Sequence, residues 1–167
     1  MRFMRVALVS SAVVLGACGG GEKKAESTPA AAPAAAPAAA PAGAPVVAGT
    51  PAPITGKTWE VKMIGDEKGY RFEPSTITAK AGDGIKFIMI TGGPHNVAFD
   101  PATLPPDVRT QLDANFGADK MAELSSNLKM NPNETFVLSL GGIKPGKYAF
   151  FCTPHLAMNM KGEIIVQ

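Results

Sequence analysis

The chain has 167 residues, of which 16 are Lys or Arg and 14 are Asp or Glu. Removing Arg2 and Arg5 with the N-terminal segment described below leaves 14 basic residues against 14 acidic ones. A balanced chain with no basic stripe and no acidic run has no strong field for nucleic acid or for steering a charged partner. We therefore expect no nucleic-acid partner.

Residues 1–20 have the layout of a secretory signal, with a basic start, a short apolar centre and small residues at the end. The apolar centre is too short to cross a bilayer as a stable helix. Residues 15–18 read Leu-Gly-Ala-Cys, which resembles a bacterial lipoprotein box. The resemblance implies a signal peptide over 1–17 and an exported chain with a lipidated Cys18, anchored on the periplasmic or extracytoplasmic side of a membrane. The alternative is an ordinary signal in which Cys18 is incidental.

Residues 18–56 are predicted to be the lipidated N-terminus and a linker, because Ala and Pro dominate from Pro29 to Pro45. Proline interrupts helices and alanine buries little surface, so no core forms there. At roughly 3.1 Å per residue such a spacer reaches up to ~100 Å.

Residues 57–167 change to the composition of a folded domain that is long enough for one hydrophobic core. Short apolar runs alternate with glycine- and proline-rich turns. Seven strands with this punctuation predict an all-β antiparallel sandwich. The predicted strands cover 58–64, 75–80, 84–90, 95–99, 134–140, 146–152 and 162–166.

The stretch 106–129 departs from the β pattern. Val108, Leu112 and Leu124 are partly at helical spacing, and Gly117 interrupts the run. We expect one or two short helices inserted between strands. The sequence indicates no role for this insertion.

The C-terminal loop carries Cys152, His155, Met158 and Met160. If Cys18 is lipidated, Cys152 has no partner for an internal disulfide, and a lone thiol in an oxidising compartment is either a liability or a ligand. Thiolate, imidazole and thioether are donors that suit copper as Cu(I) or Cu(II). Spacing alone only suggests a site, because a two-residue gap between Cys and His arises easily by chance.

His95 and His155 are the only two histidines in the chain, and both lie beside proline in turn-rich loops. A lone histidine is usually a surface residue or a satisfied core group. Two histidines whose loops can meet the remaining thiol at one end of a sandwich favour a metal site.

Several stretches resemble plastocyanin-type cupredoxins in the right order along the chain. They are residues 72–83, 94–100, 133–135, 146–155 and 160–162. The resemblance covers nearly all of 59–167 except the insertion. It implies a Greek-key β-sandwich, a cupredoxin domain over 57–167, and a mononuclear blue-copper centre with one copper ion.

The resemblance also implies roles for single residues. The family has its axial methionine five residues after the second histidine, which selects Met160, while Met158 is the other candidate. Asn96 and Thr153 resemble the pair that joins the two ligand loops by hydrogen bonds. The family usually has Tyr before the cysteine, where this chain has Phe151. The acidic patches of plant plastocyanins are not evident here.

We therefore expect a membrane-tethered, monomeric electron-transfer protein with His95, Cys152, His155 and Met160 as copper ligands. Electrons are predicted to enter and leave through His155, and we call this surface the port. Pro94, Leu156, Ala157 and Met158 surround it, and a cytochrome complex, an oxidase or a reaction centre would dock there briefly. Copper enzymes need further histidines, and none is left over, so we expect no enzyme. The main alternative is a periplasmic carrier or buffer that delivers copper to an oxidase. A cupredoxin-shaped interaction module without metal is a third reading.

Overall fold

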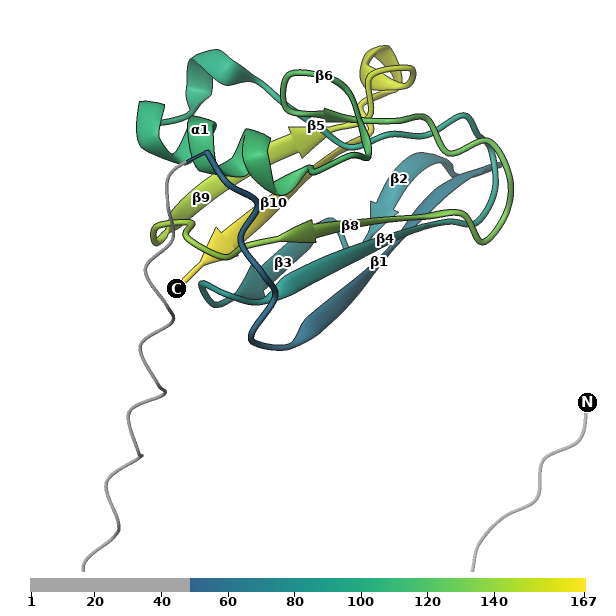
Figure 1. The fold of residues 1–167 in the computed structure, drawn as a ribbon. Helices are drawn as coiled ribbons and strands as arrows, with labels where there is room; N and C mark the ends of the chain where they lie inside the picture. The colour runs from purple at the N-terminus through teal and green to yellow at the C-terminus, as the bar shows by residue number, and fades with distance from the viewer. Residues whose placement is uncertain (1–48) are drawn as a thin grey trace, which may run out of the picture. The chain divides into compact units, whose positions relative to one another are not determined.

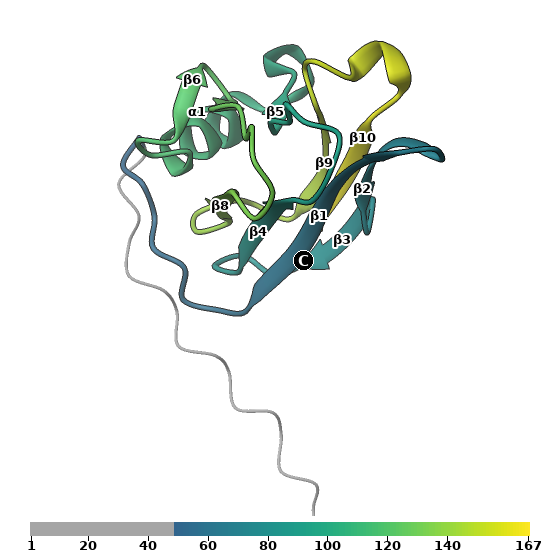
Figure 2. The same cartoon turned by 90° about the vertical axis from the view of Figure 1, so that its right-hand side faces the viewer.

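The computed structural model describes residues 49–167, which form a sandwich of two β-sheets (Figures 1 and 2). The predicted signal peptide 1–17, the lipidation of Cys18 and most of the predicted linker lie outside the described residues. In the described part, no helix is long and apolar enough to cross a membrane.

The first sheet has four strands in the order β2-β1-β4-β8 and the second has six in the order β3-β10-β9-β5-β7-β6. The first contains β1 (Thr58–Asp66), β2 (Gly69–Glu73), β4 (Gly84–Met89) and β8 (Thr135–Ser139). The second contains β3 (Thr76–Ala79), β5 (Ala98–Phe99), β6 (Lys120–Ala122), β7 (Ser125–Ser126), β9 (Gly146–Phe151) and β10 (Lys161–Val166). Two 3-10 turns, η1 (Pro101–Thr103) and η2 (Leu156–Met158), and one helix, α1 (Pro106–Asn115), complete the described elements.

The predicted all-β sandwich is confirmed, and all seven predicted strands lie within one or two residues of observed ones except that β5 is reduced to Ala98–Phe99. Not every neighbour is antiparallel, because β1 pairs with β4 and β3 pairs with β10 in parallel. In both cases the chain crosses between the sheets before it returns, which a reading of single strands does not reveal.

Aromatic rings from both sheets fill the space between the layers. Phe72 of β2 and Phe87 of β4 meet Phe150 of β9 edge-on, with ring centroids 4.7 and 5.4 Å apart. All three side chains are almost completely buried. Strand alternation produces this core, since in β9 Tyr148 and Phe150 are buried while Lys147 and Ala149 face solvent. The packed core holds the loops at one end of the sandwich in fixed positions.

The insertion at 106–129 contains one short helix, within the expected one or two, and this helix covers only its first half. Helix α1 begins with Pro106 in its first turn and ends before Gly117, whose φ of 59° lies in the left-handed region. The following residues form the short pair β6–β7 instead. The Asp113 carboxylate accepts the backbone N–H of Leu124 at 2.7 Å and so ties this pair to the helix.

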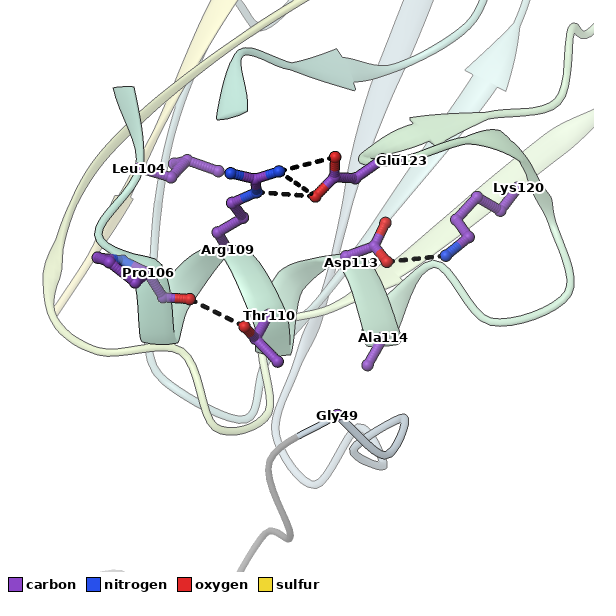
Figure 3. A pocket seen from close by; sticks show the side chains of 9 residues that line it. All are labelled: Gly49, Leu104, Pro106, Arg109, Thr110, Asp113, Ala114, Lys120 and Glu123. Carbon is purple, nitrogen blue, oxygen red and sulfur yellow. Dashed lines mark hydrogen bonds and ion pairs between the residues drawn. The ribbon is translucent and has the colours of Figure 1, made fainter. Parts of the chain in front are cut away.

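Charged side chains line a hollow of about 570 Å³ beside α1 (Figure 3). Arg109 donates to both oxygens of Glu123 at 2.7 and 2.9 Å, and Lys120 donates to Asp113 at 2.8 Å. Each cation therefore has an acidic partner inside the hollow. These pairs join α1 to the β6–β7 segment.

The segment 50–56, which composition assigns to the linker, packs against the domain. Ala52 is buried, and its backbone N–H donates to the side-chain oxygen of Asn115 at 2.9 Å. The side chain of Gln111 donates to the carbonyl of Thr50 at 2.8 Å. These contacts attach the chain to α1 before it enters β1.

Candidate metal centre

His95, Cys152 and His155 come together at one end of the sandwich, although His95 lies 57 positions before Cys152. His95 lies between β4 and β5, Cys152 directly follows β9, and His155 precedes η2. The Cys152 sulfur is 3.7 Å from Nδ1 of His95 and 3.5 Å from Nδ1 of His155. All three possible ligand atoms lie within 4.8 Å of one another.

The spacing of these three donors fits a single ion. Donor atoms separated by 3.5 Å and 3.7 Å, with none more than 4.8 Å from another, are close enough to share one ion at the distances of about 2.0–2.3 Å usual for imidazole nitrogen and thiolate sulfur. His95 and Cys152 have no exposed surface and His155 retains 6%. A soft sulfur and two imidazoles in a buried pocket match the ligand preferences of copper.

A hydrogen bond fixes the orientation of His95. Its Nε2 lies 2.8 Å from the carbonyl oxygen of Thr91. Because a carbonyl only accepts, Nε2 carries the proton and Nδ1 presents its lone pair towards Cys152. The backbone of His95 is also held, since it exchanges two hydrogen bonds with Lys129 at 3.0 and 2.7 Å.

Burial shifts the titration of all three side chains towards their neutral forms. Burial lowers the pKa of His95, a shift that the hydrogen bond to Thr91 opposes, and burial together with the nearby His95 lowers the pKa of His155. Burial raises the pKa of the Cys152 thiol, and backbone hydrogen bonds from Asn96 and His155 oppose that rise. The imidazoles are neutral donors at neutral pH, and the thiol loses its proton when it binds a metal cation.

Asn96 and Thr153 connect the two loops that carry the donors. The backbone N–H of Thr153 donates to the Asn96 side-chain oxygen at 2.8 Å, and the Asn96 amide donates to the Thr153 hydroxyl at 3.2 Å. Sequence reasoning missed a third member, Ser125 of β7, whose hydroxyl accepts from Asn96 at 3.1 Å. The insertion therefore takes part in supporting the site.

The two candidate methionines have different surroundings. Met160 is fully buried at the start of β10, and its carbonyl accepts the backbone N–H of Cys152 at 3.0 Å. The side chain of Met158 is 55% exposed. Among the other residues of the predicted port, Leu156 and Ala157 are exposed and Pro94 is half-buried.

Sequence reasoning also missed Tyr70 in β2. Its ring is stacked on that of His155, with centroids 3.8 Å apart and planes at 17°. In the sequence, Tyr70 is only an aromatic residue in a short stretch that was not predicted to be a strand. Nothing in that pattern indicates a contact with His155.

Within residues 49–167, the fold and the donor set define a β-sandwich with a buried cluster of two histidines and one cysteine that could hold a metal ion. Residues 59–167 match the model for copper binding proteins of the plastocyanin/azurin family. The chain belongs to this family, and it is a blue-copper electron-transfer protein of the cupredoxin type with one copper ion.

Two plastocyanins that are similar in sequence agree with this membership. Plastocyanin from Prochlorothrix hollandica is 33% identical over 126 residues, which cover 73% of this chain and 86% of that protein. Plastocyanin from Dryopteris crassirhizoma is 36% identical over 107 residues, which cover 62% of this chain and 96% of that protein. The solved structure of its oxidized form covers 65% of this chain and 99% of its own, with 34% identity and a TM-score of 0.49.

Proposed function

We propose that His95, Cys152 and His155 would hold the copper ion, with Met160 as a weaker fourth ligand, and that the chain shuttles single electrons between redox proteins. The observation that carries this proposal is the convergence of the three donor atoms within 4.8 Å in a buried pocket. The burial of Met160 and its backbone bond to Cys152 favour it over the exposed Met158.

The role of the protein is to hold the donors still. Copper supplies the one-electron capacity by cycling between Cu(II) and Cu(I). A set of two imidazoles, one thiolate and a thioether would accept both oxidation states, so the donors would need to move little. The Thr91 carbonyl and the Asn96–Thr153 pair restrain them from outside.

Docking is proposed at the loop that carries His155. Leu156 and Met158 are 42% and 55% exposed and form an apolar surface beside the buried imidazole. A small apolar surface favours brief contacts with a redox partner such as a cytochrome complex, an oxidase or a reaction centre. We propose that the monomer works outside the cytoplasm, held to the membrane through Cys18 and the segment that follows it.

A carrier that delivers copper to an oxidase is the alternative, and it is not an enzyme either. The exposed thioethers of Met121, Met130 and Met158 favour it, because soft surface donors suit copper exchange. The burial of all four proposed ligands argues for a shuttle, because a carrier has to release its ion readily.

Repeated redox cycles distinguish the two functions. The copper-loaded chain is reduced with ascorbate, reoxidised with ferricyanide and challenged in each state with an apo acceptor peptide rich in methionine. A shuttle retains its copper through many cycles and passes electrons without metal. Rapid loss of Cu(I) to the acceptor would contradict the proposal and support the carrier.

A further inference from the structure

The ring of Tyr70 covers a face of the His155 imidazole. The two rings are nearly parallel with centroids 3.8 Å apart, and Tyr70 also meets His95 edge-on at 6.2 Å. Tyr70 is half-buried and packs against the hydrophobic core. It belongs to β2, which contributes none of the proposed ligands.

The β1–β2 hairpin leaves a space that the Tyr70 ring fills. Gly65 lies directly opposite Tyr70 in the strand pair. A Cβ at Gly65 would lie 2.6 Å from the tyrosine ring and 2.9 Å from the Cα of Gly92, so the ring packs closely over the bare backbone. The N–H of Gly65 donates to the carbonyl of Thr91 at 2.8 Å, and the same oxygen accepts from His95. The β1–β2 hairpin is therefore linked to both imidazoles: to His155 through the Tyr70 ring, and to His95 through the Thr91 carbonyl that Gly65 and His95 share.

The two histidines differ in what orients them. Nε2 of His95 has the Thr91 carbonyl as its partner. Within residues 49–167, no hydrogen bond involves Nε2 of His155, and the only polar contact of its ring is between Nδ1 and the Cys152 sulfur at 3.5 Å. Metal-bound histidines are normally oriented by a second contact on the side away from the metal. His155 has aromatic contacts instead: the Tyr70 ring stacks on its face with centroids 3.8 Å apart, and the His95 ring meets it edge-on at 4.9 Å.

We propose that Tyr70 is the positioning residue for His155: its ring keeps the imidazole in the orientation in which Nδ1 faces the copper. This inference rests on the proposed ligand role of His155. The phenol hydroxyl is not needed for stacking, so the aromatic ring alone carries the effect. Offset or parallel aromatic pairs add a modest stabilisation beyond buried area, which corresponds to about 2- to 10-fold in an equilibrium or rate constant.

The test compares copper-loaded full-length variants by two measurements: the rate of Cu(I) transfer to bicinchoninic acid and the electron paramagnetic resonance spectrum of the Cu(II) form. Tyr70→Phe retains the stack and should match the original chain in both. Tyr70→Leu and Tyr70→Val lack the ring, and Val suits a strand if Leu folds poorly. Both should release Cu(I) about 2- to 10-fold faster, with a changed copper hyperfine splitting.

Trp59→Leu is the matched control, because Trp59 is a partly exposed aromatic of the neighbouring strand β1 that contacts Asp83 and not the metal centre. It should lower stability without changing the copper spectrum or the release rate. Unchanged release and spectrum in the Tyr70→Leu and Tyr70→Val variants would overturn the inference, as would equal effects of Trp59→Leu. If the unmodified chain shows no thiolate-to-copper absorption, the proposed ligand set fails instead.

Discussion

Replacing Asn96 by Ala tests how strongly the two ligand loops are joined. The Asn96 side chain is 1% exposed and makes three hydrogen bonds, to the backbone and hydroxyl of Thr153 and to the hydroxyl of Ser125. Each such bond contributes about 0.5–1.5 kcal/mol net. Thr153 is exposed and can be rehydrated, so the expected loss is about 2–4 kcal/mol in the free energy of unfolding.

Urea denaturation of the full-length chain without copper measures this loss. With a typical m-value of about 1–3 kcal/mol/M, the midpoint should fall by roughly 1–2 M. The matched variant Thr153→Val removes a hydroxyl but leaves the bond from its N–H, so we expect about 1 kcal/mol. In a double-mutant cycle the two changes should be less than additive, because they share a bond. A loss below about 1 kcal/mol for Asn96→Ala, or strict additivity, would refute this reasoning.

Three further predictions concern separate parts of the domain. Burial raises the pKa of Asp83, but its hydrogen bonds from two backbone N–H groups and the Trp59 indole outweigh that effect, so the net pKa is lowered. Because the pKa of Asp83 is lower in the folded than in the unfolded chain, its carboxylate stabilises the fold above the unfolded pKa, and this contribution is lost as the pH falls through the folded pKa. The free energy of unfolding should therefore decline below about pH 4. Asp83→Asn should flatten that decline in urea titrations at several pH values. Met160→Leu should raise the reduction potential measured by voltammetry, because a thioether donor is lost, whereas Met158→Leu should leave it unchanged. Leu156→Asp should slow electron exchange with a redox partner in stopped-flow measurements without altering the visible spectrum, and an unchanged rate would place the port elsewhere.

The central strands and the donor cluster could be predicted because local patterns determine them. Strand β4 alternates buried and half-buried residues, β9 alternates buried residues with more exposed ones, and turns with glycine or proline bound both strands. Cys152 and His155 share one short loop, which leaves His95 as the only other histidine that can approach them. Because the sequence offers so few possible metal donors, the set of His95, Cys152 and His155 could be predicted from it.

The unpredicted features depend on contacts between distant segments. Strand β2 is short and includes the charged Arg71, and β6 is exposed throughout, so neither shows a clear alternation. One short helix forms in 106–129, as predicted, but the β6–β7 pair after it was not predicted, because the side chain of Asp113 and the turn at Gly117 redirect the chain. The stacking of Tyr70 on His155 brings together residues from opposite sheets and has no local signature.

The most direct measurement of the central claim is the visible absorption spectrum during titration of the full-length chain with Cu(II). The account predicts an intense thiolate-to-copper band in the red that saturates at one copper per chain and is absent from the Cys152→Ser variant. A band that persists in that variant, or binding of copper without such a band, would contradict the shared site of Cys152 and the two histidines.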